Sequence, residues 1–288
     1  MKKNLMEKRP NEIDKKAGYP EHPDQLVVKK NEFFPSGVKE IDAFNYYAGI
    51  KSKLIPELKG RDLFVVMAIN PGDELYVRHP YDKKTEFIRI NSDKDFEKYH
   101  TGKTVEYHRT SPTITNEVVF DIDPGPEATF DSIKDVVAQC LYFIKKQDDF
   151  KDKHEIRYTG KRGFHITGYL KDKKNINSIK KDIEKRLDKE FKNNEKIVVA
   201  TNKPTGKKIN IDLSPMKVEG GHIAPYSMRI DTGLCCKPVS DLKKFEKKDA
   251  KFDKMYKELT GFKFKFNKQK SSYYMVLQEI NKFGYKRS

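Results

Sequence analysis

Residues 117–125 read EVVFDIDPG, an apolar alternation that runs into two acids and then a Pro-Gly pair. The alternation predicts a strand over 117–123, and the Pro-Gly pair predicts its end. Because residues i and i+2 point to the same face of a strand, Asp121 and Asp123 are expected to project together. Two adjacent carboxylates repel each other, and a divalent cation relieves that repulsion by taking their oxygens as ligands. The simpler alternative is a solvated strand end with two ordinary surface acids.

A third acid occurs in a similar setting. Asp212 closes the alternation KINID, residues 208–212, which predicts a second strand that ends in a carboxylate. Three carboxylates from two strands suit a two-metal phosphoryl-transfer site, where one metal activates an attacking hydroxyl and the other supports the leaving pyrophosphate. The third acid therefore strengthens the metal-site hypothesis beyond what Asp-x-Asp alone carries.

A glycine turn lies between the two acidic strands. Residues 159–165 read TGKRGFH and bring together a hydroxyl, two cations and an imidazole, those of Thr159, Lys161, Arg162 and His165. These side chains donate hydrogen bonds that suit phosphate oxygens, and the two glycines allow a tight turn with exposed N–H groups. The stretch is not a Walker loop. A basic hairpin turn, with His165 as an ordinary strand histidine, is the alternative interpretation.

The surrounding segments predict a mixture of helices and strands. Apolar residues at helical spacing predict helices over 39–58, 129–144, 179–191 and 242–259. Apolar runs predict strands over 63–68, 117–123, 208–213 and 226–230, and a strand, turn and strand over 155–170. Thr129 or Asp131 is the candidate N-cap of the second helix. Strands and helices do not alternate strictly, so the predicted fold class is α+β.

The composition of the chain indicates which class of molecule it binds and in which cellular compartment it acts. The 288 residues carry a net charge of +16, which indicates a polyanion partner, with nucleic acid as the first candidate. A generally lysine-rich protein would show the same excess. We expect no membrane span, since no run of about 18 apolar residues occurs. The first twenty residues lack the apolar core of a secretory signal, and three cysteines cannot form a disulfide framework. A cytoplasmic, nucleoid-associated protein is therefore expected.

Taken in order, the pieces FDID, TGKRGFH, NID and APYSMR resemble the motifs of the archaeo-eukaryotic primase superfamily. The resemblance is closest to the polymerase (primase-polymerase) domain of bacterial and archaeal ligase D, which acts in non-homologous end joining. It covers roughly residues 25–240. It implies a primase-like catalytic core with mixed and antiparallel sheets flanked by helices. Two positions depart from the ligase D pattern, because Thr159 stands where Ser is usual and Arg162 where Lys is favoured.

The resemblance also implies a domain organisation. Residues 1–25 are expected to be a flexible N-terminal segment, and 26–240 the catalytic domain. Within that domain, about 26–115 would form an N-terminal part and about 116–240 the catalytic core. Residues 241–288 would be a basic helical extension packed on the same domain.

Roles for individual residues follow from the same resemblance. Asp121, Asp123 and Asp212 would be catalytic and would hold two Mn²⁺ or Mg²⁺ ions. The nucleotide would be bound by His108, Thr159, Lys161, Arg162, His165, Ser227 and Arg229. The DNA would be bound by Lys29, Lys30 and Lys39, at a 5′-phosphate, and by Tyr76, stacked on a base. No zinc is expected, since Cys140, Cys235 and Cys236 lack the spaced pairs of a zinc site.

Some of these roles have equally simple alternatives. His108 fits a surface strand histidine, the N-terminal lysines fit a solvated charge run, and Tyr76 fits a core tyrosine. The cysteines are interpreted as packing residues.

The implied function is a template-dependent nucleotidyltransferase that adds nucleotides to a primer 3′-end and fills gaps in end-joining repair. Its substrates would be NTPs or dNTPs, on gapped or end-containing duplex DNA and primer-templates. A separate DNA ligase and an end-binding protein are candidate partners. One alternative is a de novo primase of a mobile element or replicon. Another, from a different class, is a non-catalytic nucleic-acid-binding protein.

Overall fold

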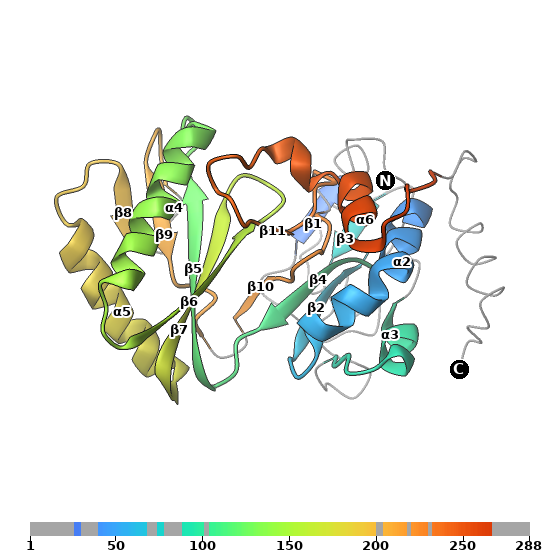
Figure 1. Cartoon of the computed structure of the whole chain (residues 1–288), viewed down its shortest axis with the longest axis horizontal. Coiled ribbons are helices and arrows are strands. Elements are labelled where there is room, and N and C mark those ends of the chain that lie inside the picture. Colours follow the sequence, from blue (N-terminus) through green and yellow to red (C-terminus); the bar gives the residue numbers. More distant parts are fainter. Residues whose placement is uncertain are drawn as a thin grey trace, which may run out of the picture. The chain divides into compact units, whose positions relative to one another are not determined.

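The computed structural model describes residues 26–29, 40–67, 74–77, 88–100, 104–199, 204–217, 220–229 and 232–266. These residues form two compact units (Figure 1). Unit 1 holds the described residues up to Arg109, those of Tyr226–Leu234 and those from Lys251 on. Unit 2 holds the described residues of Thr110–Pro225 and Cys235–Ala250. Each unit is described by itself below.

Unit 2 is built on a six-stranded mixed sheet. Its strands, in spatial order, are β11 (Lys237–Pro238), β6 (Phe150–Tyr158), β7 (Phe164–Asn175), β5 (Ile114–Pro124), β9 (Ile209–Asp212) and β8 (Ile197–Val199). Every pair of neighbours is antiparallel except β8 and β9, which are parallel. The unit also contains the short strand β10 (Gly221–Ile223) and the 3₁₀ helix η3 (Lys247–Ala250). The predicted acidic strands are thus β5 and β9, and they are direct neighbours.

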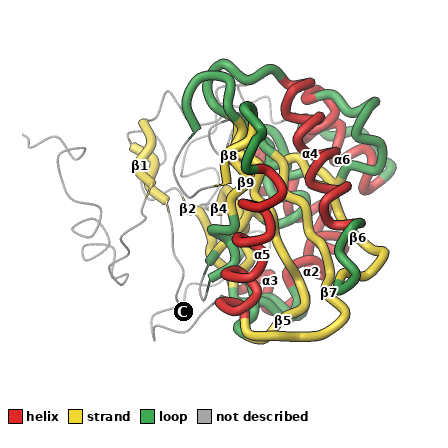
Figure 2. Tube along the Cα trace, turned by 90° about the vertical axis from the view of Figure 1, so that its left-hand side faces the viewer, coloured by secondary structure: helices red, strands yellow, loops and turns green. Residues whose placement is uncertain are grey.

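Two helices run along this sheet, α4 (Phe130–Lys145) and α5 (Ile176–Phe191) (Figure 2). Thr129 caps α4, since its hydroxyl accepts the N–H of Ser132. Phe120 of β5 contacts Phe143 of α4, which in turn contacts Phe191 of α5. The helices therefore cover the face of β5 that carries Phe120. Because strand residues alternate between faces, the neighbouring acids of β5 lie on the opposite face.

Unit 1 combines small antiparallel pairs with three helices. The pairs are β1 (Leu26–Lys29) with β3 (Glu74–Val77), and β2 (Leu63–Met67) with β4 (Thr104–Thr110). The helices are α2 (Glu40–Leu58), α3 (Asp93–Tyr99) and α6 (Phe252–Thr260). Tyr46 and Tyr47 of α2 are fully buried in an aromatic core. Tyr107 of β4 packs edge-on against Tyr47, so the odd-numbered face of β4 turns toward this core.

Most predicted elements are present, with ends shifted by a few residues, and the α+β fold class is confirmed. Two expectations are wrong. Residues 226–229 do not form the strand predicted there, because Tyr226 has a left-handed φ of 67° that breaks an extended run. The helix predicted over 242–259 begins only at Phe252. Before it, the carboxylate of Asp241 accepts the N–H groups of Lys243 and Lys244, which makes a turn.

Two further observations concern the cysteines and the apolar character of the helices. Cys140, Cys235 and Cys236 are fully buried thiols, which suits the packing role predicted for them. Among the described helices, none combines the length and the apolar character needed to span a membrane.

Candidate active site

A row of polar side chains that includes three candidate site residues crosses the sheet of unit 2. Asp121 of β5 lies directly opposite His165 of β7 on one side and Asp212 of β9 on the other. His165 in turn lies opposite Arg157 of β6. Residues in register share a face, so all four belong to the face away from α4 and α5. His165 Nε2 lies 3.3 Å from Asp121 Oδ1. Strand pairing thus brings together three predicted site residues that are far apart in the sequence.

The carboxylates of this row are held close to one another in a partly dry environment. Burial raises the pKa of Asp212, and the negative charge of Asp121 raises it further. The N–H of Ser214, 2.6 Å from Asp212 Oδ1, partly offsets these effects. Asp123 projects from the same face of β5, opposite Asn210 of β9. The raised pKa reports a carboxylate whose charge is not fully compensated by the protein.

The resemblance implies a divalent cation, for which these carboxylates are the candidate ligands. Oxygen donors are what Mg²⁺ and Mn²⁺ prefer, and the uncompensated charge of Asp212 favours a cation. Within the described residues, no cluster of three or more His, Cys, Asp or Glu side chains is arranged to hold a metal ion. The chemistry of the carboxylate oxygens fits such a cation, although their arrangement does not form a complete coordination site. Asp121 and Asp212 lie directly opposite each other, and Asp123 lies on the same face of β5, two residues after Asp121.

The glycine turn is built as a tight, internally bonded loop against β5. Gly160 has a φ of 84°, which a side chain would disfavour. Thr159 closes the turn, since its N–H and its hydroxyl both donate to the carbonyl of Gly163, at 3.1 and 3.2 Å. A Cβ on Gly163 would collide with the carbonyl oxygen of Ile122 and would lie 3.3 Å from Asp123 Oδ1. Glycine at this position lets the turn lie directly beside the acidic end of β5.

Arg162 ties the turn to the loop that follows β5. Its Nη2 donates to the carbonyls of Gly125, Pro126 and Ala128, at 2.9, 3.1 and 3.3 Å. The contacts seen for this predicted phosphate-binding residue are therefore with the backbone. Lys161 is exposed.

Lys247 of η3 is a neighbouring cation that the sequence analysis did not single out. Burial lowers the pKa of Lys247, and the charge of Arg162 lowers it further. Its ammonium lies 4.9 Å from the centre of the Phe130 ring. Lys247 lies in a lysine-rich segment, and nothing in that segment distinguishes it from the neighbouring lysines. The sequence therefore could not predict that Lys247 lies near Arg162.

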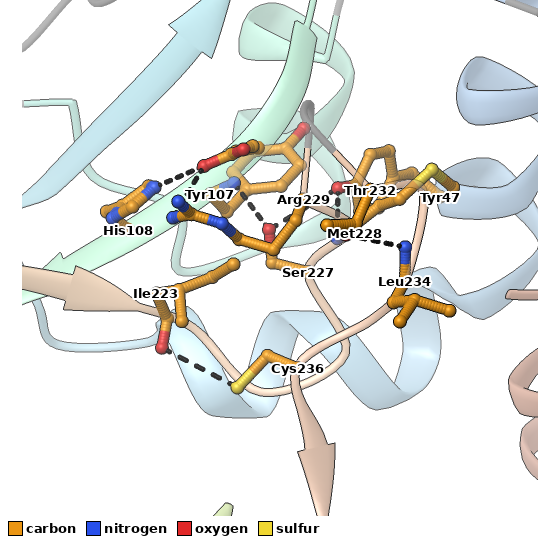
Figure 3. Close-up of polar contacts among 11 residues, drawn as sticks. Tyr47, Tyr107, His108, Ile223, Ser227, Met228, Arg229, Thr232, Leu234 and Cys236 are labelled. Atoms are coloured by element: carbon orange, nitrogen blue, oxygen red, sulfur yellow. Dashed lines mark hydrogen bonds and ion pairs between the residues drawn. The ribbon is translucent and has the colours of Figure 1, made fainter. Parts of the chain in front are cut away.

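The remaining predicted nucleotide-binding residues, His108, Ser227 and Arg229, belong to unit 1, and two of them, His108 and Arg229, contact one carboxylate, which is drawn without a label in Figure 3. Glu106 and His108 alternate along β4, so they lie on one face of it. His108 Nε2 lies 2.7 Å from Glu106 Oε2, and Arg229 Nη1 lies 3.4 Å from the same oxygen. The Glu106 side chain is only 3% exposed. Sequence reasoning missed Glu106, although the Glu-x-His alternation was a possible signal.

Ser227 is held inside unit 1. It is fully buried, its hydroxyl oxygen accepts the N–H of Tyr107 at 2.8 Å, and it lies 3.4 Å from the hydroxyl of Tyr47. The N–H of Met228 donates to the same Tyr47 hydroxyl at 2.8 Å (Figure 3). The hydroxyl of Tyr46 donates to the carbonyl of Tyr226. The paired tyrosines of α2 thus fix the backbone that leads to Arg229.

The predicted DNA-binding residues are described incompletely. Lys29 lies in β1 and Tyr76 in β3, and only their backbone is described. Lys30 and Lys39 lie outside the described residues. The predicted site residues that the structure does describe therefore fall into two groups, one in each unit.

Comparison with known proteins bears on this arrangement. A family model described as LigD, primase-polymerase domain, matches residues 81–260, more than half of the chain. The chain belongs to this family. Membership supports a nucleotidyltransferase of the end-joining primase-polymerase type, and the family depends on divalent metal ions. The superfamily resemblance in the sequence is thereby confirmed.

A solved structure supports the fold of this LigD-type chain. The polymerase domain of Mycobacterium tuberculosis ligase D, determined in complex with DNA, is similar with a TM-score of 0.56 at 15% identity. The match covers 90% of this chain and 95% of the mycobacterial one. At that identity the likeness establishes the fold alone. No curated protein matches the sequence.

Proposed function

We propose that this LigD-type chain is a template-dependent nucleotidyltransferase that extends a primer 3′-end and fills short gaps during end joining. The observation that carries the proposal is the row of Asp212, Asp121 and His165 on the face of the sheet away from α4 and α5, in a chain of this family. Its substrates would be a nucleoside triphosphate and a primer-template. The +16 charge and the DNA bound to the similar mycobacterial domain support DNA as the polyanion.

The chemistry assigns distinct tasks to the residues of unit 2. The primer 3′-oxygen would attack the α-phosphorus, the hydroxyl proton would leave, and pyrophosphate would be released. Asp121, Asp123 and Asp212 would hold Mg²⁺ or Mn²⁺, which lowers the pKa of a bound hydroxyl and stabilises the leaving group. His165 would be oriented by its contact with Asp121.

The turn and the residues of unit 1 would bind the nucleotide. N–H groups and cations placed around a triphosphate stabilise the charge that develops as pyrophosphate leaves. This role is proposed for Thr159, Lys161, Arg162, His165, His108 and Arg229, with Ser227 supporting Arg229 from inside unit 1. For DNA contacts we propose Lys29, Lys30, Lys39 and Tyr76. A ligase that seals the filled gap and a protein that holds the broken ends would complete the repair reaction.

The test is extension of a labelled primer on a short gapped duplex, with Mn²⁺ and either NTPs or dNTPs. The parent protein is compared with Asp121→Asn, which keeps the shape of the side chain and removes its charge. We expect Asp121→Asn to lose at least a hundredfold in rate. Asp172→Asn is the matched control, since this acid lies on the exposed end of β7. Primer extension by Asp121→Asn at the rate of the parent protein would refute the proposal.

The same assay addresses the repair role. The downstream strand carries either a 5′-phosphate or a 5′-hydroxyl. Gap filling predicts faster extension with the phosphate. Indifference to the phosphate, together with synthesis on single strands without a primer, would favour a priming role instead.

A further inference from the structure

Glu106 has a position that neither the family match nor the motif pattern explains. Its side chain is only 3% exposed. Its Oε2 lies 2.7 Å from Nε2 of His108 and 3.4 Å from Nη1 of Arg229, and its carboxylate is the one drawn without a label in Figure 3. A carboxylate buried to this degree is strongly disfavoured unless donors compensate its charge. His108 and Arg229 are both residues for which nucleotide binding is proposed. A buried acid that is shared by two such residues is well placed to set their directions.

The backbone around Arg229 is already fixed by other contacts. Its N–H donates to the carbonyl of Leu234 at 2.8 Å, and its own carbonyl accepts the N–H of Gly233 at 2.8 Å. The hydrogen bonds of Ser227 and Met228 to the tyrosine pair hold the preceding residues. With the backbone restrained on both sides, the long side chain is the part of Arg229 whose direction still has to be set. Glu106 supplies a contact that sets it.

We propose that Glu106 is a positioning residue, which orients His108 and Arg229 toward the phosphates of the nucleotide. The proposal rests on the proposed function, because that function supplies the triphosphate. The arrangement resembles in logic the buried acid that orients a catalytic histidine in hydrolases. Glu106 acts through its two neighbours and need not touch the nucleotide. Its removal should therefore affect nucleotide affinity only while those neighbours are present.

The test is a double-mutant cycle on nucleotide binding, measured by calorimetry with a nucleoside triphosphate and Ca²⁺, so that no turnover is needed. We expect Glu106→Gln to weaken binding roughly tenfold and Arg229→Gln roughly thirtyfold. The double variant should lose less affinity than the product of the two single losses, because the part of the Glu106 effect that runs through Arg229 is already gone when Arg229 is replaced. Binding of primer-template DNA and the far-UV circular dichroism spectrum should stay unchanged in Glu106→Gln.

The matched control is Glu57→Gln. Glu57 of α2 pairs with Arg109, which lies on β4 as Glu106 does, at the same 3.4 Å, but it contacts neither candidate residue. Its replacement should leave nucleotide affinity unchanged. If Glu106→Gln is unfolded, Glu106→Asp gives the same comparison, because its shorter carboxylate cannot reach both donors.

Two outcomes would overturn the proposal: nucleotide binding by Glu106→Gln at parental strength, or fully additive losses in the double variant. The proposed function fails separately. A protein that binds nucleotide in a Glu106-dependent manner but extends no primer would refute the polymerase assignment and leave the role of Glu106 intact.

Discussion

His100 makes the stability of unit 1 sensitive to acid. The imidazole is fully buried and stacks on the rings of Phe44 and Phe96, each with centroids 4.6 Å away. Nδ1 lies 2.9 Å from the hydroxyl of Tyr107, and Nε2 lies 3.1 Å from the carbonyl of Phe44. A neutral ring satisfies both contacts, since Nε2–H donates to the carbonyl and Nδ1 accepts the hydroxyl. Burial lowers the pKa of His100 from 6.5 to about 4.

The direction and the size of the effect follow from this shift. The unfolded chain binds a proton at His100 near pH 6.5, whereas the folded chain binds it only near pH 4. Between these values the unfolded state holds more protons, so lowering the pH favours unfolding. At about 1.4 kcal/mol per pKa unit, the stability contributed by neutral His100 falls by about 2 kcal/mol by pH 5. The loss reaches about 3 kcal/mol at pH 4 and approaches about 3.5 kcal/mol below it.

The assay is urea unfolding followed by far-UV circular dichroism, because the chain has no tryptophan. Other groups titrate over the same range, so the parent is compared with His100→Gln, whose amide keeps a donor and an acceptor but does not titrate. At pH 7.5 the variant should be the less stable protein, because it loses the ring stacking. The gap should narrow by about 2 kcal/mol as the pH is lowered to 5. A gap that stays constant over this range would refute the reasoning.

Three substitutions in unit 2 give further expectations. Gly163→Ala should lower the melting temperature and abolish primer extension, since the added methyl collides with the carbonyl of Ile122; full activity would contradict this. Arg162→Lys should cost about 1 kcal/mol in urea unfolding, because a lysine cannot reproduce the guanidinium contacts to three carbonyls. Arg157 is fully buried and bonds Thr167 through Nη2, while Nε and Nη1 have no hydrogen-bond partner among the described residues. Arg157→Met should therefore leave the free energy of unfolding unchanged or raise it. A decrease in the free energy of unfolding of more than about 2 kcal/mol would contradict this expectation, because it would mean that the protein compensates the guanidinium charge.

The acidic half of the candidate site could be predicted from the sequence because its signals are local. Asp121 and Asp123 follow an apolar alternation that a Pro-Gly pair ends, and the glycine turn is marked by its own residues. What the sequence did not show was that Asp121, Asp212 and His165 lie side by side. That juxtaposition depends on which strands pair and in which register, and register is a property of the whole sheet.

The features that were missed depend on contacts between distant residues. Glu106 meets Arg229 across 123 positions of sequence, and a single acid in a strand carries no local sign of such a partner. The strand expected over 226–230 has suitable residues, but Tyr226 adopts a positive φ and its carbonyl accepts the hydroxyl of Tyr46, 180 positions away. Tertiary contacts there override the local preference.

The row across β7, β5 and β9 limits where residues can be inserted into this protein without loss of the site. Faces alternate at every residue, so one inserted residue ahead of Phe120 in β5 would turn the Asp121 carboxylate toward Phe143 and the helices, and Phe120 toward the opposite face. Insertions in the connecting loops preserve the pairing. Length variation in this protein should therefore be confined to loops, and a single-residue insertion at any position of β5 ahead of Asp121 should abolish activity, whereas insertions in the connecting loops should be tolerated.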